Sequence, residues 1–202
     1  MIKNVILDFG NVIGTFDEDY ILGLYYETPE DRQLAKGPIL SGWATLDAGR
    51  IDYDVYIKNV LDKLPQRLYE PTRAFFADWY RHLPYVGGID ELTTEVKNMG
   101  LGLYLLSNAP VVFSENRDFY KILKKFDGIV FSGDIQLAKP GPEIYEYILN
   151  KYSLNPRECV FADDREDNIE TARRFGIDGY LFRNDASKFL EYIKRNVLSD
   201  EE

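Results

Sequence analysis

The chain has 202 residues, of which 45% are hydrophobic, and its formal net charge is −10. This length suits one full-sized α/β domain with a small accessory module and argues against two unrelated large domains. The acidic balance argues against a nucleic-acid partner, because no basic stripe is available to neutralise phosphates. The apolar stretch at the N-terminus, about five residues, is too short for a signal peptide or a membrane span, so we expect a cytoplasmic protein without a membrane partner.

Short apolar runs separated by helical patterns predict a parallel sheet. The runs that we interpret as strands are Asn4 to Phe9, Leu101 to Leu106, Gly128 to Phe131, Glu158 to Ala162 and Gly179 to Phe182. Apolar spacings of three and four residues predict amphipathic helices between strands, and Gly100 and Gly176 are well placed to end two of them. The alternation indicates an α/β fold with a doubly wound, mostly parallel, Rossmann-like sheet.

This alternation is interrupted after the first strand by about seventy residues, Gly14 to Tyr85, that contain no convincing strand. Amphipathic stretches over 55–64 and 72–83 predict helices there. The many aromatic side chains of the segment are more typical of the core of a small bundle than of a ligand cage. We therefore expect a small all-helical insertion.

The predicted elements divide the chain into two domains. The core domain comprises residues 1–14 and 86–202, and the helical cap domain comprises residues 15–85. The last residues, Ser199 to Glu202, are predicted to be a frayed acidic end.

The only cysteine and the only histidine argue against several kinds of site. Cys159 has no partner for an internal disulfide or a multi-cysteine zinc site, and its place in a predicted core strand favours a buried apolar role. His82 lies away from the motifs described below. A serine triad or a histidine phosphorelay is therefore poorly supported.

Polar residues that follow the predicted strands form the candidate site, because ligands of doubly wound sheets bind beyond the carboxyl ends of the strands. In chain order these residues are Asp8, Ser107 with Asn108, Lys139, and Asp163 with Asp164. Three carboxylates at one sheet edge would repel one another unless a cation lay between them. Hard oxygen ligands of this kind point to Mg²⁺.

The motifs around these residues resemble those of a known family. Asp-x-Gly-Asn-Val, Leu-Ser-Asn, Lys-Pro and Phe-Ala-Asp-Asp-x-x-x-Asn occur in this order over nearly the whole chain. In order and spacing they resemble the four motifs of the haloacid dehalogenase superfamily. The insertion is similar to the small helical cap of that family, and Gly49-Arg50-Ile51 resembles a frequent cap sequence. The opening motif is most similar to that of bacterial sugar-phosphate phosphatases related to alpha-D-glucose-1-phosphate phosphatase.

The resemblance implies a role for each motif residue. Asp8 would attack phosphorus and form an aspartyl-phosphate. Mg²⁺ would be held by Asp8, the backbone carbonyl of Gly10, Asp164 and, through a bound water, Asp163. Ser107 and Asn108 would bind the phosphoryl group, and Lys139 would neutralise the charge that it shares with the nucleophile. Asn168 would orient the acidic loop, whereas Asp167 is predicted to be an exposed residue in the first turn of a helix.

One position departs from the family pattern. Most phosphatases of this superfamily carry a second aspartate two residues after the nucleophile, as general acid and base, and here that residue is Gly10. Three accounts are open. Asp17 or Asp19 could substitute when the cap closes, the substrate could have a leaving group that needs little protonation, or turnover could be lost in favour of binding or regulation. Asp17 is equally well interpreted as the N-cap of the first cap helix.

We therefore predict a Mg²⁺-dependent phosphatase that hydrolyses a small phosphorylated metabolite, a phosphomonoester of the sugar-phosphate kind. A metal-independent 2-haloacid dehalogenase is an alternative, but the Asp163-Asp164 pair argues against it. Two further negative charges would oppose a carboxylate substrate and a departing halide unless a metal neutralised them. A binding protein without turnover is the other alternative. The sequence does not predict the oligomeric state.

Overall fold

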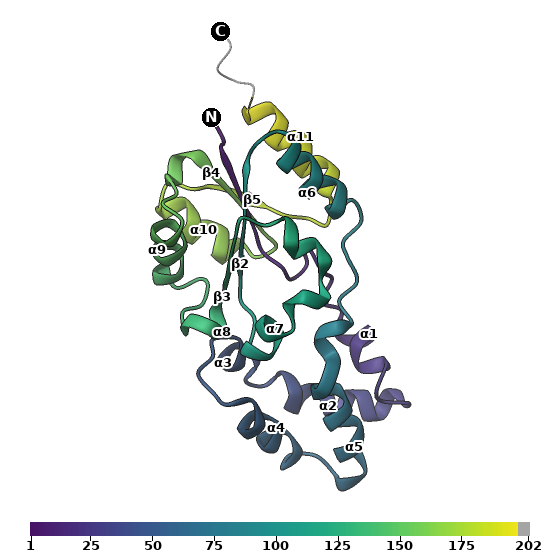
Figure 1. Cartoon of the computed structure of the whole chain (residues 1–202). Coiled ribbons are helices and arrows are strands. Elements are labelled where there is room, and N and C mark those ends of the chain that lie inside the picture. The colour runs from purple at the N-terminus through teal and green to yellow at the C-terminus, as the bar shows by residue number, and fades with distance from the viewer. Residues whose placement is uncertain (198–202) are drawn as a thin grey trace.

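The structure is a computed structural model that describes residues 1–197, and it confirms the predicted α/β class (Figure 1). The prediction for Ser199 to Glu202 lies outside the described residues. Five parallel strands form one sheet in the order β3-β2-β1-β4-β5. The strands are β1 (Asn4–Leu7), β2 (Gly102–Ser107), β3 (Gly128–Phe131), β4 (Cys159–Asp163) and β5 (Asp178–Leu181).

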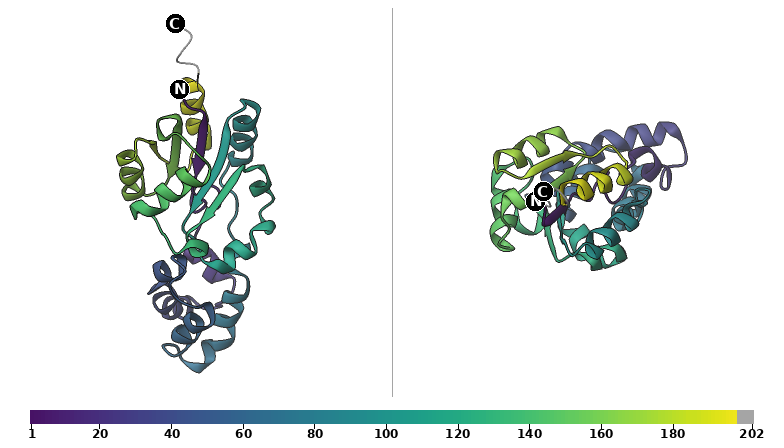
Figure 2. Two further views of the ribbon diagram at one scale, coloured as in Figure 1. Left: turned by 60° about the vertical axis from the view of Figure 1, so that its left-hand side comes forward. Right: turned by 90° about the horizontal axis from the view of Figure 1, so that it is seen from above.

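Helices cover both faces of the sheet, as Figure 2 shows. The longer ones outside the insertion are α6 (Ile89–Asn98), α9 (Pro142–Lys151), α10 (Glu166–Arg174) and α11 (Ala186–Val197), and short ones are α7 (Val111–Glu115) and α8 (Ser132–Ile135). Alternate residues of β1 point to opposite faces: Val5 joins the apolar cluster under α6 and α11, and Ile6 joins the cluster under α9 and α10. Burial on both faces explains why the strands read as continuous apolar runs.

The predicted strand ends shift by one or two residues. β1 ends at Leu7 rather than Phe9, because the chain turns tightly there and the carbonyl of Phe9 accepts hydrogen bonds from the N–H groups of Ile13 and Gly14. The fourth strand extends to Asp163, which pairs in register with Leu181. Gly100 and Gly176 follow α6 and α10 with φ angles of 73° and 82°, which confirms both as helix terminators.

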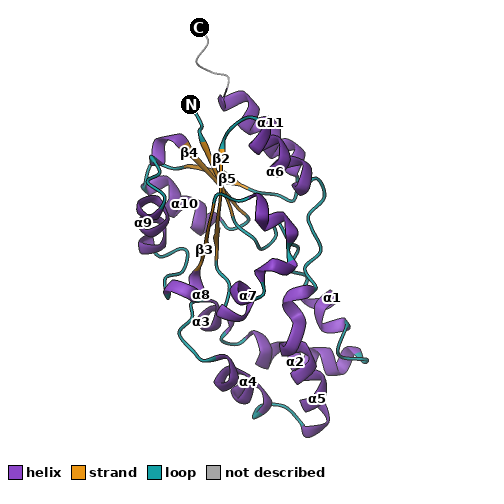
Figure 3. Cartoon of the chain, in the orientation of Figure 1, coloured by secondary structure: helices purple, strands orange, loops and turns teal. Residues whose placement is uncertain are grey.

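The segment between β1 and α6 is helical and lies beyond the carboxyl ends of the strands (Figures 1 and 3). Its helices are α1 (Glu18–Gly23), α2 (Pro29–Leu40), α3 (Trp43–Asp47), α4 (Tyr53–Leu61) and α5 (Tyr69–Asp78), with short 3₁₀ turns at Gln66–Leu68 and Trp79–Arg81. The helix predicted over 55–64 begins two residues earlier, because Asp52 caps it by accepting a hydrogen bond from Val55 N–H. The helix predicted over 72–83 is divided between α5 and the 3₁₀ turn that follows it.

The chain leaves and re-enters the core at neighbouring points. Thr15 N–H donates to the carbonyl of Pro84 at 2.8 Å, and Val86 N–H donates to that of Ile13 at 2.9 Å. A continuous apolar cluster runs from the helical segment to one face of the sheet. The helical segment therefore packs directly on the core, while its division from the core as a separate domain stays a prediction. Within residues 1–197, no helix has the length and apolar character needed to cross a membrane.

Candidate active site

Asp8 lies directly beyond β1 and is 8% exposed. Its Oδ1 accepts a hydrogen bond from Phe9 N–H at 2.7 Å and forms an ion pair with Lys139 Nζ at 2.9 Å. Both contacts use the same oxygen. Within the described chain, Oδ2 is left free to attack an electrophile or to bind a cation.

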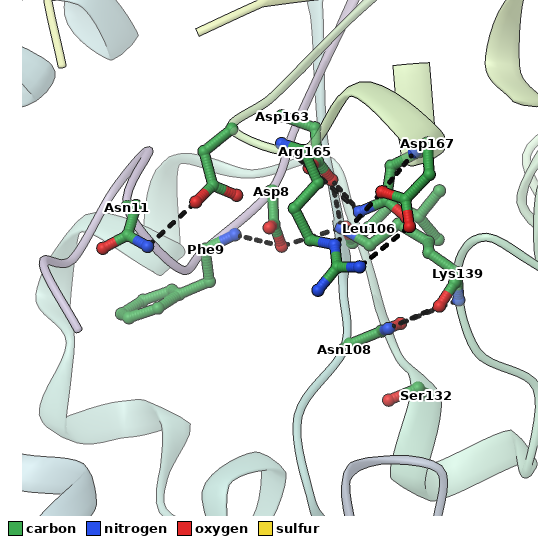
Figure 4. A network of polar contacts seen from close by, with 12 residues as sticks. Asp8, Phe9, Asn11, Leu106, Asn108, Ser132, Lys139, Asp163, Arg165 and Asp167 are labelled. Atoms are coloured by element: carbon green, nitrogen blue, oxygen red, sulfur yellow. Dashed lines mark hydrogen bonds and ion pairs between the residues drawn. The ribbon is translucent and has the colours of Figure 1, made fainter. Parts of the chain in front are cut away.

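Lys139 is 5% exposed and takes part in the network of polar contacts drawn in Figure 4. Its Nζ contacts Asp8 Oδ1, donates to Asp163 Oδ2 at 2.7 Å, and donates to the carbonyl of Leu106 at 2.7 Å. Burial opposes the charge on this ammonium group, but Asp163 and Asp8 outweigh that effect and raise the pKa of Lys139. The lysine therefore stays charged and offsets two carboxylates.

Asp163 ends β4, is fully buried, and has both of its oxygens satisfied. Arg165 N–H donates to Oδ1 at 2.9 Å, and the side-chain amide of Asn168 donates to Oδ1 and Oδ2 at 2.9 Å each. These contacts bear out the predicted role of Asn168, which orients the acidic loop. Asp167 lies in the first turn of α10 and pairs with the exposed Arg165 guanidinium at 2.8 Å, as expected of a surface residue.

Burial opposes the ionisation of Asp8. Burial raises the pKa of Asp8 to about 7; Lys139 acts in the opposite direction, and Asp163 and Asp164 add to the rise. A cation close to these carboxylates would favour the ionised form of Asp8, which is the nucleophilic form.

The donor set suits Mg²⁺. One oxygen from each of Asp8, Asp163 and Asp164 lies within 4.8 Å of the others, and Asn11 Nδ2 holds Asp164 by donating to its Oδ2 at 2.9 Å. Hard carboxylate oxygens converging on one point are the ligands that Mg²⁺ prefers. The residues present therefore fit the predicted metal. Gly10 faces the same cavity, and the part assigned to its carbonyl stays a prediction.

The segment after β2 holds the lysine loop in place. Asn108 Nδ2 donates to the carbonyl of Lys139 at 2.8 Å, and Lys139 N–H donates to Asn108 Oδ1 at 2.9 Å. Ser107 ends β2, is 2% exposed, and lines the cavity beside Asn108. Asn108 thus positions Lys139, and phosphoryl binding by Ser107 and Asn108 stays a prediction.

These residues open into a cavity of about 540 Å³ between the sheet edge and the helical segment. The sheet edge lines it with polar groups, whereas aromatic side chains of the helical segment (Phe16, Trp43 and Trp79) and Phe113 of α7 supply much of its apolar lining. The predicted substitute acid Asp17 is not part of this lining. Its exposed Oδ1 accepts a hydrogen bond from Tyr20 N–H at 3.0 Å, which makes it the N-cap of α1. Asp19 is likewise exposed and pairs with Lys36 at 3.0 Å. Their participation as acids stays a prediction.

Asp47, at the end of α3, lines the same cavity from the side of the helical segment. The sequence motifs do not predict a site role for this residue. It lies two residues before Gly49-Arg50-Ile51, which resembles a cap sequence, but nothing in that pattern marks Asp47 as lining the cavity. Its orientation depends on how α3 docks on the core, which local sequence does not specify.

The sequence of the chain is similar to those of known phosphatases. The sequence model of a family described as haloacid dehalogenase-like hydrolase matches residues 2–176. A D-ribitol-5-phosphate phosphatase of Bacteroides thetaiotaomicron is 27% identical over 202 residues, which covers 92% of this chain and 94% of that protein. A phosphorylated carbohydrates phosphatase of Thermotoga maritima is 28% identical over 123 residues, 60% of this chain and 56% of that protein. The chain thus matches little more than half of the second relative.

Solved structures share the fold. A haloacid dehalogenase family enzyme of Bacteroides thetaiotaomicron, in complex with magnesium and inorganic phosphate, superposes with a TM-score of 0.70 at 22% identity, covering 94% of this chain and 99% of that one. The L-2-haloacid dehalogenase of Xanthobacter autotrophicus gives a TM-score of 0.66 at 16% identity, with coverage of 99% and 84%. At these identities the likeness establishes the fold alone.

Proposed function

We propose that this chain, which belongs to the haloacid dehalogenase-like hydrolases, is a Mg²⁺-dependent phosphatase that hydrolyses a small phosphorylated carbohydrate through a phosphoenzyme on Asp8. The observation that carries the proposal is the convergence of Asp8, Asp163 and Asp164 around the buried ammonium group of Lys139. An anionic substrate can approach an acidic site only where cations offset its charge.

The chain's own residues suit nucleophilic attack on phosphorus. Asp8 Oδ2 would attack while Phe9 N–H and Lys139 Nζ hold Oδ1 and fix the carboxylate plane. Lys139 would also reduce the repulsion between the nucleophile and the phosphoryl oxygens. Ser107 would bind a phosphoryl oxygen from the end of β2. When held by Asp8 and Asp164, with Asp163 acting through a bound water, Mg²⁺ would supply charge that stabilises the transferring phosphoryl group.

Two relatives support a phosphorylated carbohydrate as substrate, since their names specify a pentitol phosphate and phosphorylated carbohydrates. The cavity of about 540 Å³ has the volume of a small-metabolite site. The narrower likeness to alpha-D-glucose-1-phosphate phosphatase stays a prediction. The acidic pair Asp163-Asp164 disfavours the dehalogenase alternative, because with Asp8 it brings three carboxylates to a site where Lys139 pairs with only two, and a haloacid carboxylate would meet the remaining negative charge.

A phosphate-release panel tests the proposal. The purified chain with Mg²⁺ is assayed on polyol and sugar phosphates, nucleotides and acyl phosphates, beside Asp8→Asn and the matched control Asp54→Asn. Asp54 is an exposed first-turn residue of α4 and does not line the cavity. We expect Asp8→Asn and EDTA to abolish turnover and Asp54→Asn to retain it.

Two results would contradict the proposal. Equal phosphate release by Asp8→Asn and the wild-type chain would exclude Asp8 as the nucleophile. Halide release from a 2-haloacid that persists in EDTA would instead support the dehalogenase alternative.

A further inference from the structure

The proposed reaction needs a group that protonates the leaving oxygen and later deprotonates water. Gly10 has no side chain to do this, although a Cβ built on Gly10 would meet no atom within 4 Å. In the described chain, the carboxylic acids that line the cavity are Asp8, Asp47 and Asp164. Asp8 is the proposed nucleophile and Asp164 belongs to the metal donor set, so Asp47 is left for proton transfer.

The Asp47 carboxyl group is held without a partner. Its Oδ1 is buried and has no hydrogen-bond partner anywhere in residues 1–197. A buried polar atom without a partner destabilises a fold, so a purely structural role does not account for it. Burial raises the pKa of Asp47 well above its usual range; the charge of Asp8 adds to the rise and that of Lys139 opposes it. The Asp47 carboxyl group is therefore protonated, and able to act as an acid, at a higher pH than an ordinary aspartic acid.

Backbone contacts dock the end of α3 on the core and so fix where Asp47 points. Ser132 Oγ donates to the backbone carbonyl of Asp47 at 2.5 Å. Gly49 has a φ of +64° and packs so closely on Gly133 that an added Cβ would lie 2.3 Å from the Gly133 carbonyl oxygen. Gln136 Nε2 donates to the carbonyl of Gly49 at 3.3 Å. A helix of the insertion is thereby tied to α8 and to the loop after it.

We infer that Asp47 is the general acid and base of this enzyme, delivered from the helical segment in place of the missing carboxylate at position 10. The inference rests on the proposed function. As Asp8 Oδ2 bonds to phosphorus and the bond from phosphorus to the leaving oxygen breaks, Asp47 gives its proton to that oxygen and the alcohol departs. The Asp47 carboxylate then takes a proton from water as the water oxygen attacks phosphorus. The bond from Asp8 to phosphorus breaks, phosphate leaves, and Asp47 is again protonated.

Two leaving groups separate this role from a structural one. Asp47→Asn is compared with the wild-type chain on the alkyl phosphate that the wild type hydrolyses fastest in the panel above, and on p-nitrophenyl phosphate. An alkoxide needs a proton to depart, whereas p-nitrophenolate is a stable anion. We expect kcat on the alkyl phosphate to fall by about 10²- to 10⁴-fold, the usual contribution of general acid–base catalysis.

With p-nitrophenyl phosphate, formation of the phosphoenzyme needs no acid, because the leaving group departs as a stable anion. Hydrolysis of the phosphoenzyme still lacks its base in Asp47→Asn. We expect Asp47→Asn to release a burst of p-nitrophenol equal to the enzyme concentration, followed by slow turnover, with phosphoenzyme accumulating. Adding Gly10→Asp to Asp47→Asn should restore part of the lost kcat, because it places a carboxyl group in open space at the family's usual position. If Asp47→Asn does not fold, Asp47→Ala is assayed on the same two substrates instead.

Several results would overturn the inference. An unchanged kcat on the alkyl phosphate, or an equal loss on both substrates without a burst, would remove Asp47 from proton transfer. The same leaving-group dependence in Asp17→Asn but not in Asp47→Asn would assign the role to Asp17. These results all presuppose wild-type turnover. A wild-type chain that releases no phosphate from any substrate would overturn the proposed function, and the inference with it.

Discussion

The buried ammonium group of Lys139 determines how much negative charge the site can hold. It lies 2.9 Å from Asp8 and 2.7 Å from Asp163, and its side chain is 1% exposed. Such a group is stabilising only while both carboxylates remain paired with it, because removal of one partner leaves an uncompensated buried charge.

Replacing Lys139 with Met tests this balance. Lys139→Met keeps much of the side-chain volume and removes the charge, so we expect the free energy of unfolding to fall by about 3–5 kcal/mol in EDTA. Urea denaturation measures the change. The matched control is Lys3→Met, which removes an exposed pair with Glu158 and should cost about 0–1 kcal/mol. Equal losses in the two variants would mean that the Lys139 pairs contribute no more than surface pairs.

At the scale of elements, the backbone just after α3 packs directly against the backbone of the core helix α8. Gly49 lies in the left-handed region and faces Gly133 too closely for any side chain. This close approach accounts for glycine at position 49, whereas Gly133 is required by its own close approach to the backbone of Ala109 and Val111, where an added Cβ would lie 2.8 Å and 2.7 Å away. The contact of Gly49 with Gly133 also connects the helical segment with the cavity, because Asp47 lies two residues before Gly49.

Gly49→Ala should therefore displace α3 from the core. We expect a loss of stability, from the strained backbone and the contact at 2.3 Å, together with lower turnover. Gly37→Ala is the control, since Gly37 lies inside α2 and an added Cβ would meet nothing within 4 Å. That change should stabilise the chain by about 0.5–1 kcal/mol. Thermal unfolding and phosphate release measured on both variants check the prediction, and a Gly49→Ala protein with wild-type stability and rate would refute it.

For the molecule as a whole, metal binding and folding are linked, because the metal donors come from β1 and β4 and the loop after β4. Mg²⁺ that binds only the folded state should raise stability by about 2.7 kcal/mol at a concentration one hundred times its Kd. We expect Mg²⁺ to raise the Tm of the wild-type chain, and to raise it less in Asp164→Ala. Asp167→Ala, which removes an exposed carboxylate of the same segment, should keep the full rise. An equal rise in both variants would contradict the assigned metal donors.

The sheet and its polar edge could be predicted because both follow from short-range patterns. Asp8 and Asp163 each follow a buried apolar run directly, Lys139 follows the third run after a short helix and a loop, and the parallel arrangement brings the ends of those runs together. Asp47 could not be found in this way, since its orientation depends on the contacts of Asp47, Gly49 and Gly133 between segments far apart in the chain. The pairing of the Asn108 amide with the Lys139 backbone could not be predicted for the same reason, because it is a tertiary contact.

Trapping the phosphoenzyme tests the central claim most directly. The wild-type chain with Mg²⁺ is mixed with its best substrate, quenched in acid during the first turnover, and analysed by peptide mass spectrometry. We predict one phosphoryl group on the peptide that contains Asp8, and none in Asp8→Asn. Steady phosphate release with no phosphorylated peptide at any quench time, retained in Asp8→Asn, would contradict the account.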